Sequence, residues 1–246
     1  MSRIPHLLVV QHQDDGPLGR LEPAFRQATQ LDVRRPDRGD ALPEDLDGVH
    51  GLVVLGGSMA AWEDERASWL PATRALMARA VETGVPLLGI CLGAQLLAHA
   101  TGGRVERGAV GIEAGLGVVM PTDEAEGDPL MSALPIEGYV GTQGHQDAIT
   151  ELPPHAVLLG TGELYQHQAF RLGPVAWGVQ YHPEVTADDF AGWMREDADA
   201  VVAAGLDPDE VARAVKDADD RLDELAAAHA AAFLGVVSGA SAGARR

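Results

Sequence analysis

The sequence predicts an α/β fold with a mainly parallel central sheet that is covered by helices on both faces. Short, entirely apolar runs recur along the first half of the chain, each run is bounded by turn residues, and helical patterns separate the runs. Strands that are apolar on both faces are typical of parallel sheets, because helices cover both sides of such a sheet. The middle of the chain carries shorter strands between Gly, Pro and acidic turns, which predicts added antiparallel strands.

The first half supplies the parallel strands and the helices between them. The strands predicted there are 7–10, 31–33, 52–55 and 86–90. A helical turn is predicted at 43–46 and a longer helix over 66–81, where apolar residues recur on one helical face and Gly84 ends the pattern. The strand over 86–90 runs directly into a predicted helix over 93–100.

The second half predicts the antiparallel strands and a helical end. The strands predicted there are 115–120, 138–142, 156–159, 168–172 and 175–181, with a short helix starting near Asp128. Thr186 is typical of a helix N-cap, and an Ala-rich helix over 213–234 precedes a frayed tail at 238–246. We therefore expect a main domain over 1–195 and a helical C-terminal extension over 196–246.

The bulk composition limits the classes of partner. Eighteen basic residues against 37 acidic residues give a formal net charge of −19, which argues against nucleic acid or an anionic membrane as a partner. One cysteine excludes an internal disulfide, and the short apolar run at the N-terminus is unlike a signal peptide, so a cytoplasmic location is expected. No stretch of about 20 consecutive apolar residues is found, so no membrane span is expected.

That single cysteine, Cys91, lies where a strand turns directly into a helix. The motif Gly89-Ile90-Cys91-Leu92-Gly93 has the pattern of a nucleophile elbow. Glycines two residues before and two after the cysteine suit a turn in which a Cβ atom would clash. A cysteine at a helix N-terminus also meets unpaired N–H groups, which favour a thiolate. The alternative is a small buried hydrophobe, and the flanking glycines favour the nucleophile.

A cysteine nucleophile needs a base and a group that orients the base. His182 follows the strand predicted over 175–181 and precedes Pro183 and Glu184. An imidazole at a strand end, with a carboxylate two residues later, can be oriented locally. His-Pro-Glu alone is a weak motif that also suits an exposed turn.

Three ordered motifs together resemble the class I (triad-type) glutamine amidotransferase family, and most closely its stand-alone domains that are similar to GMP synthase. The motifs are Gly56-Gly57, the segment from Gly89 to Gln95, and Gln180-Tyr181-His182-Pro183-Glu184. The resemblance covers about residues 5–195 and implies a flavodoxin-like arrangement of the sheet. It implies no cofactor.

The resemblance implies a role for each motif. Cys91 would attack the side-chain amide of glutamine, His182 would act as base and then acid, and Glu184 would orient His182. The backbone N–H groups of Gly57 and Leu92 would form the oxyanion hole. The resulting γ-glutamyl thioester would release ammonia.

The substrate pocket is implied by two further segments. Gln95 matches a position that contacts the substrate glutamine in the family, and His145 and Asp147 resemble a His-x-Asp loop that borders the pocket. Gly144 departs from the family, where Ser or Trp precedes the histidine. His145, Asp147, His182 and Glu184 could also be metal ligands, but the elbow accounts for His182 and Glu184 without an ion, so no metal is expected.

Two other functions remain open at this point. The same triad would serve a γ-glutamyl hydrolase or peptidase that acts on γ-glutamyl conjugates, and the domain could also be a non-catalytic regulatory relic. The chain has no P-loop, so an ammonia-accepting synthetase would be a separate chain. Whether the chain forms a homo-oligomer and what the C-terminal extension contacts are also left open.

Overall fold

The central sheet of this protein is mixed, with a parallel half and an antiparallel half. The computed structural model describes residues 4–243, and within them nine strands form this sheet. In spatial order they are β2 (Gln30–Arg34), β1 (His6–Val10), β3 (Gly51–Val54), β4 (Leu87–Ile90), β11 (Ala176–Val179), β10 (Ala169–Leu172), β9 (Val157–Thr161), β6 (Glu113–Pro121) and β7 (Tyr139–His145). The strands from β2 to β11 are parallel, and each pair from β11 to β7 is antiparallel. The predicted fold class is confirmed.

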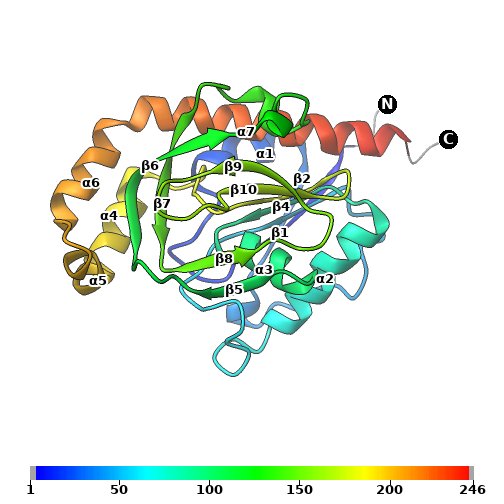
Figure 1. The fold of residues 1–246 in the computed structure, drawn as a ribbon. Helices are drawn as coiled ribbons and strands as arrows, with labels where there is room; N and C mark the ends of the chain where they lie inside the picture. Colours follow the sequence, from blue (N-terminus) through cyan, green and yellow to red (C-terminus); the bar gives the residue numbers. More distant parts are fainter. Residues whose placement is uncertain (1–3, 244–246) are drawn as a thin grey trace.

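Helices cover both faces of the sheet, as the apolar strands predict (Figure 1). Leu7 and Val9 of β1 join one core with residues of α1 (Glu22–Ala28) and α7 (Asp219–Gly243). Leu8 and Val10, which point to the opposite side of the same strand, join a second core with α2 (Leu70–Thr83) and α3 (Leu92–Ala100).

Three helices between β11 and α7 form a smaller third core. They are α4 (Ala187–Glu196), α5 (Ala198–Ala203) and α6 (Pro208–Asp217). Phe190, Met194, Val201 and Val215 are buried together there. The predicted cap is present, because the Thr186 hydroxyl accepts a hydrogen bond from the Asp189 N–H at 3.2 Å. This cluster places the end of α4 beside the carboxyl edge of the parallel strands.

The C-terminal extension packs against the main sheet through α7. Leu225, Ala226, Phe233 and Val237 of this helix are buried in the core that also contains α1. Asp219–Ala240 has a mean hydropathy of 1.2 and is, among residues 4–243, the helix whose length and composition would allow a membrane span. Core helices of soluble proteins pass the same test. The expected boundary after residue 195 stays a prediction.

Several local predictions are wrong. The helix predicted over 213–234 is broken at Ala218, and α7 continues through the predicted tail to Gly243, while 244–246 lie outside the described residues. A bend replaces the helical turn at 43–46. Neither α1 nor the separate pair β5 (Arg104–Arg107) and β8 (Asp147–Glu151) was predicted, because these segments are short and mostly polar. Short 3₁₀ helices occur at Gly19–Leu21, Pro36–Arg38, Asp123–Ala125 and Met131–Ala133.

Candidate active site

Three parallel strands deliver the candidate catalytic residues to one edge of the sheet. β3 leads into Gly56 and Gly57, β4 into Cys91, and β11 toward His182. Because parallel strands share a direction, their carboxyl ends meet at the same edge, where ligands bind in open α/β sheets. The shared direction of the three strands is therefore enough to bring the predicted residues to the same edge of the sheet.

Cys91 has the strained backbone of a nucleophile elbow. Its φ of 50° and ψ of −106° lie where non-glycine residues are rare, and its N–H donates to the Val179 carbonyl at 2.8 Å. A Cβ at Gly93 would lie 2.0 Å from the Val54 carbonyl oxygen, and one at Gly89 would lie 2.6 Å from the Gly93 oxygen. The two glycines are therefore required because the start of α3 contacts the backbone of its neighbours.

His182 and Glu184 form a buried pair. The His182 Nδ1–H donates to Glu184 Oε1 at 2.7 Å, and both side chains are 3% exposed. Burial alone lowers the pKa of His182, but the charges of Glu184 and Cys91 outweigh burial and raise that pKa to about 10. His182 Nε2 is buried and has no hydrogen-bond partner within residues 4–243, so this nitrogen is available for proton transfer.

Backbone contacts fix the loop that carries this pair. The His182 N–H donates to the Thr142 carbonyl at 2.8 Å, and the Arg20 N–H donates to the Glu184 carbonyl at 2.8 Å. Gly19 has a φ of 46°, and a Cβ there would lie 2.1 Å from the Glu184 oxygen. The Arg20 side chain also pairs with Asp219 at the start of α7. The C-terminal helix is therefore connected to the catalytic loop.

Trp193 supports the catalytic imidazole and accounts for Gly144. The rings of Trp193 and His182 meet edge to face with their centroids 4.7 Å apart, and the Trp193 Nε1–H donates to the Asp15 carbonyl at 2.9 Å. A Cβ at Gly144 would lie 3.3 Å from the Trp193 ring. The space beside Gly144 is thus filled by a ring from α4, which the sequence did not predict.

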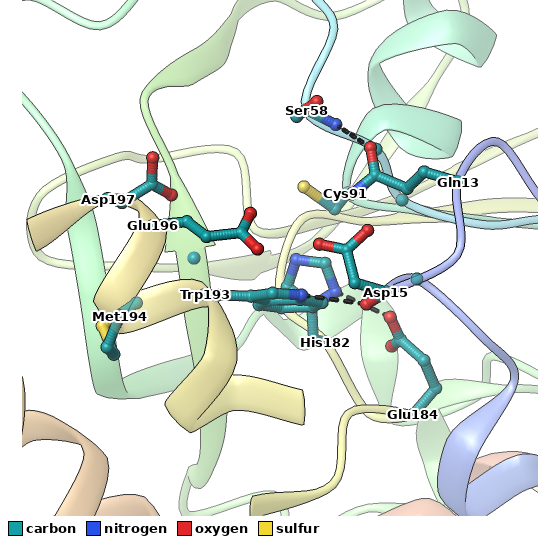
Figure 2. A pocket seen from close by; sticks show the side chains of 14 residues that line it. Gln13, Asp15, Ser58, Cys91, His182, Glu184, Trp193, Met194, Glu196 and Asp197 are labelled. Atoms are coloured by element: carbon teal, nitrogen blue, oxygen red, sulfur yellow. Dashed lines mark hydrogen bonds and ion pairs between the residues drawn. The ribbon is translucent and has the colours of Figure 1, made fainter. Parts of the chain in front are cut away.

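Two connected hollows open on either side of Cys91, and we name each by one lining residue. The His145 lobe is lined by Cys91, Gln95, Arg107, Ile112, Gly144, His145, Gln146 and Asp147, with Gly57, Ser58, Met59 and Asp197 at its border. The Trp193 lobe is lined by Gln13, Asp15, Gly16, Gly56, Gly57, Ser58, Cys91, Gly144, His182, Glu184, Trp193, Met194, Glu196 and Asp197 (Figure 2). His182 lines only the Trp193 lobe.

The predicted substrate-binding residues line the His145 lobe, but the polar atoms of two of them already form hydrogen bonds with other protein groups. Gln95 Nε2 donates to the Asp147 carbonyl at 3.0 Å and to Gln180 Oε1 at 3.2 Å. The two ring nitrogens of His145 face the Asp147 carbonyl at 2.9 Å and Glu113 Oε2 at 3.0 Å. His145 is thus part of the wall of the lobe, and no sequence motif predicted Glu113 as its partner.

The third predicted residue, Asp147, also lines this lobe, and Gln180 contacts two of its lining residues, Gln95 and Cys91. The Asp147 carboxylate forms an ion pair with Arg107, with Nε and Oδ1 3.1 Å apart, and burial raises the pKa of Asp147 while Arg107 lowers it. Gln180 Nε2 lies 3.6 Å from Cys91 Sγ. Gln180 stands two residues before His182 on the same strand end, so its position could have been inferred from the motif.

Gly57 and Leu92 lie on either side of the nucleophile. Gly57 lines both lobes, and a Cβ there would contact Met59 Sδ at 2.7 Å and Leu92 Cδ2 at 3.0 Å. Leu92 is the first residue of α3, where the N–H groups of a helix have no partner within the helix. Their assignment as oxyanion donors stays a proposal.

The alternative metal site is not assembled. Its four candidate ligands belong to three separate pairs, which are His182 with Glu184, His145 with Glu113, and Asp147 with Arg107. Among residues 4–243, no group of three His, Cys, Asp or Glu side chains could hold a metal ion.

Comparison with known proteins decides the family. The family model "Glutamine amidotransferase class-I" matches residues 23–197. The chain belongs to this family. A solved glutamine amidotransferase from Thermotoga maritima superposes with a TM-score of 0.82 at 27% identity, covering 94% of this chain and 99% of that one.

Curated relatives of the chain carry two kinds of activity in their names. A GMP synthase (glutamine-hydrolyzing) of Porphyromonas gingivalis is 34% identical over 156 residues, which is 58% of this chain and 26% of that protein. Gamma-glutamyl peptidase 5 of Arabidopsis thaliana is 32% identical over 151 residues, which is 57% of this chain and 56% of that protein. The chain thus spans only part of these relatives, and both activities concern a γ-glutamyl group or glutamine.

Proposed function

We propose that this protein hydrolyses the side-chain amide of glutamine through a γ-glutamyl thioester on Cys91 and releases ammonia for a partner. The observation that carries the proposal is the buried His182–Glu184 pair beside an elbow cysteine at the ends of three parallel strands. The family membership supports amide hydrolysis, and the triad itself is our assignment.

We infer a place for each half of the substrate from the residues that line the two lobes. The leaving nitrogen must receive a proton from His182, and His182 lines only the Trp193 lobe. The acyl half therefore occupies the His145 lobe, where Arg107 suits the α-carboxylate and Asp147 suits the α-ammonium group of a glutamyl moiety.

The reaction then follows from the residues. The Cys91 thiolate attacks the amide carbon, and the N–H groups of Gly57 and Leu92 stabilise the oxyanion. The C–N bond breaks as His182 protonates the nitrogen. Water, deprotonated by His182, next hydrolyses the thioester to glutamate and restores the thiolate.

A second candidate function, hydrolysis of γ-glutamyl conjugates, is favoured by the Trp193 lobe. This lobe continues past His182 to Trp193, Met194 and Glu196, which is more space than a departing ammonia requires. The peptidase among the relatives supports the same reading.

Turnover of free glutamine and of γ-glutamyl dipeptides, measured with wild type and Cys91→Ala, tests the proposal. Glutamine turnover at least equal to dipeptide turnover, abolished by Cys91→Ala, is the expected result. Faster dipeptide cleavage would establish the second candidate instead. No activity in either protein would indicate a non-catalytic relic, and equal measurable activity in both would show that hydrolysis does not pass through Cys91.

A further inference from the structure

Three carboxylates surround the side of the active site from which the leaving group departs. Asp15 follows β1, whereas Glu196 ends α4 and Asp197 follows it, so two distant segments contribute the charges. Figure 2 shows the carboxylates of Asp15 and Glu196 directed into the space beside Cys91. Within residues 4–243, neither carboxylate has an ion-pair partner, and no Arg or Lys lines the Trp193 lobe.

The charges in this lobe act on one another. Burial and the negative charge of Asp15 both raise the pKa of Asp197. Glu196 is the last residue of α4. The C-terminus of a helix carries a partial negative charge, which repels an ionised carboxylate at that position. A positive ligand would relieve both effects.

An independent observation places unsatisfied polar atoms in the same lobe. Glu184 Oε2 and His182 Nε2 are buried without a hydrogen-bond partner among the described residues, and both side chains line the Trp193 lobe. The Trp193 ring also lines this lobe and supplies an apolar surface beside the acids. Such a surface suits a short methylene chain that ends in an ammonium group.

We propose that the site also accepts the γ-glutamyl amide of a diamine or polyamine, and that it prefers this amide to other γ-glutamyl conjugates because its second, cationic nitrogen binds Asp15, Glu196 and Asp197. This inference rests on the proposed thioester chemistry of Cys91. The amide C–N bond breaks, the amine nitrogen takes its proton from His182, and water converts the thioester to glutamate. The sum is one amide and one water giving glutamate and the free amine.

The test compares kcat/KM for three substrates: glutamine, γ-glutamyl-n-butylamide and the γ-glutamyl amide of 1,4-diaminobutane. The two amides have the same methylene chain and differ in the terminal ammonium group. We expect the diamine amide to exceed the butylamide by at least about tenfold at low salt, because three partly exposed carboxylates each contribute a modest attraction.

Variants and added salt test whether the preference for the diamine amide depends on these carboxylates and on their charge. The ratio of kcat/KM for the diamine amide to that for the butylamide should fall by about tenfold in Asp15→Asn/Glu196→Gln. It should not change in Asp199→Asn, a matched exposed acid of α5 that does not line the lobe. In the wild type, the ratio should decrease as NaCl is raised, which tests the charge without any mutation.

The outcomes separate this inference from the proposed function. Equal kcat/KM for the two amides would overturn the cationic subsite and leave the thioester chemistry standing. Failure of all three substrates to acylate Cys91 would overturn the proposed function and this inference together.

Discussion

The carboxylate of Glu184 controls the charge of His182, and Glu184→Gln tests this directly. Glutamine has the shape of glutamate and can still accept the Nδ1–H at the 2.7 Å position, but it carries no charge. Burial then opposes protonation with only Cys91 against it, so the pKa of His182 falls from about 10 toward the usual 6.5 or below. At pH 8 the protonated fraction of His182 would drop from about 99% to about 3%, which is about 30-fold.

The assay is the single-turnover rate of Cys91 acylation between pH 6 and 8, measured by acid quench and mass spectrometry. We expect a nearly flat profile for the wild type and a rate for Glu184→Gln that falls by an order of magnitude or more toward pH 8. His182→Asn should abolish acylation. Glu82→Gln, an exposed acid of α2, is the control. A flat profile for Glu184→Gln at the wild-type rate would refute the assigned role of the carboxylate.

Three further predictions concern the elbow and the support of His182. Because the pKa of His182 is raised in the folded state, its protonation stabilises the fold fully below pH 6.5, and this stabilisation is lost as the pH rises through about 10. The difference in unfolding free energy between wild type and His182→Asn, measured by urea titration, should therefore become smaller from pH 6.5 to pH 10. A difference that stays constant with pH would contradict this prediction. Gly93→Ala should lower the unfolding free energy by about 3 kcal/mol or more because its Cβ meets the Val54 carbonyl, whereas Gly235→Ala, which has open space in α7, should be neutral or stabilising in the same titration. Trp193→Ala should lower kcat by about tenfold or more through a misplaced imidazole, and Trp193→Phe should retain most of the activity; equal kcat in both variants would remove the positioning role.

The fold and the convergence of the candidate catalytic residues could be predicted because their signals are local. Cys91 lies between two glycines at a strand–helix junction, and His182 and Glu184 are two residues apart at a strand end. The parallel sheet then brings these segments together, since consecutive strands share their carboxyl edge. The apolar runs that form β1, β3 and β4 predict that sheet directly.

The rest of the site depends on tertiary contacts that no local pattern records. Trp193 packs on His182 only because the third core places α4 at the sheet edge. Glu113 forms a hydrogen bond with His145 although the two residues are 32 positions apart in the sequence. Asp15 and Glu196 are far apart in the sequence, and nothing in the sequence around either residue distinguishes it from an ordinary surface acid. Their shared lobe is visible only in three dimensions.

The most direct test of the central claim is isolation of the acyl-enzyme. The protein is mixed with glutamine, a γ-glutamyl dipeptide or the diamine amide, quenched in acid, digested and analysed by mass spectrometry. The account predicts that the peptide containing Cys91 gains the mass of one γ-glutamyl group in the wild type and gains none in His182→Asn. Turnover of any of these donors without acylated Cys91, or with acylation at another residue, would contradict it.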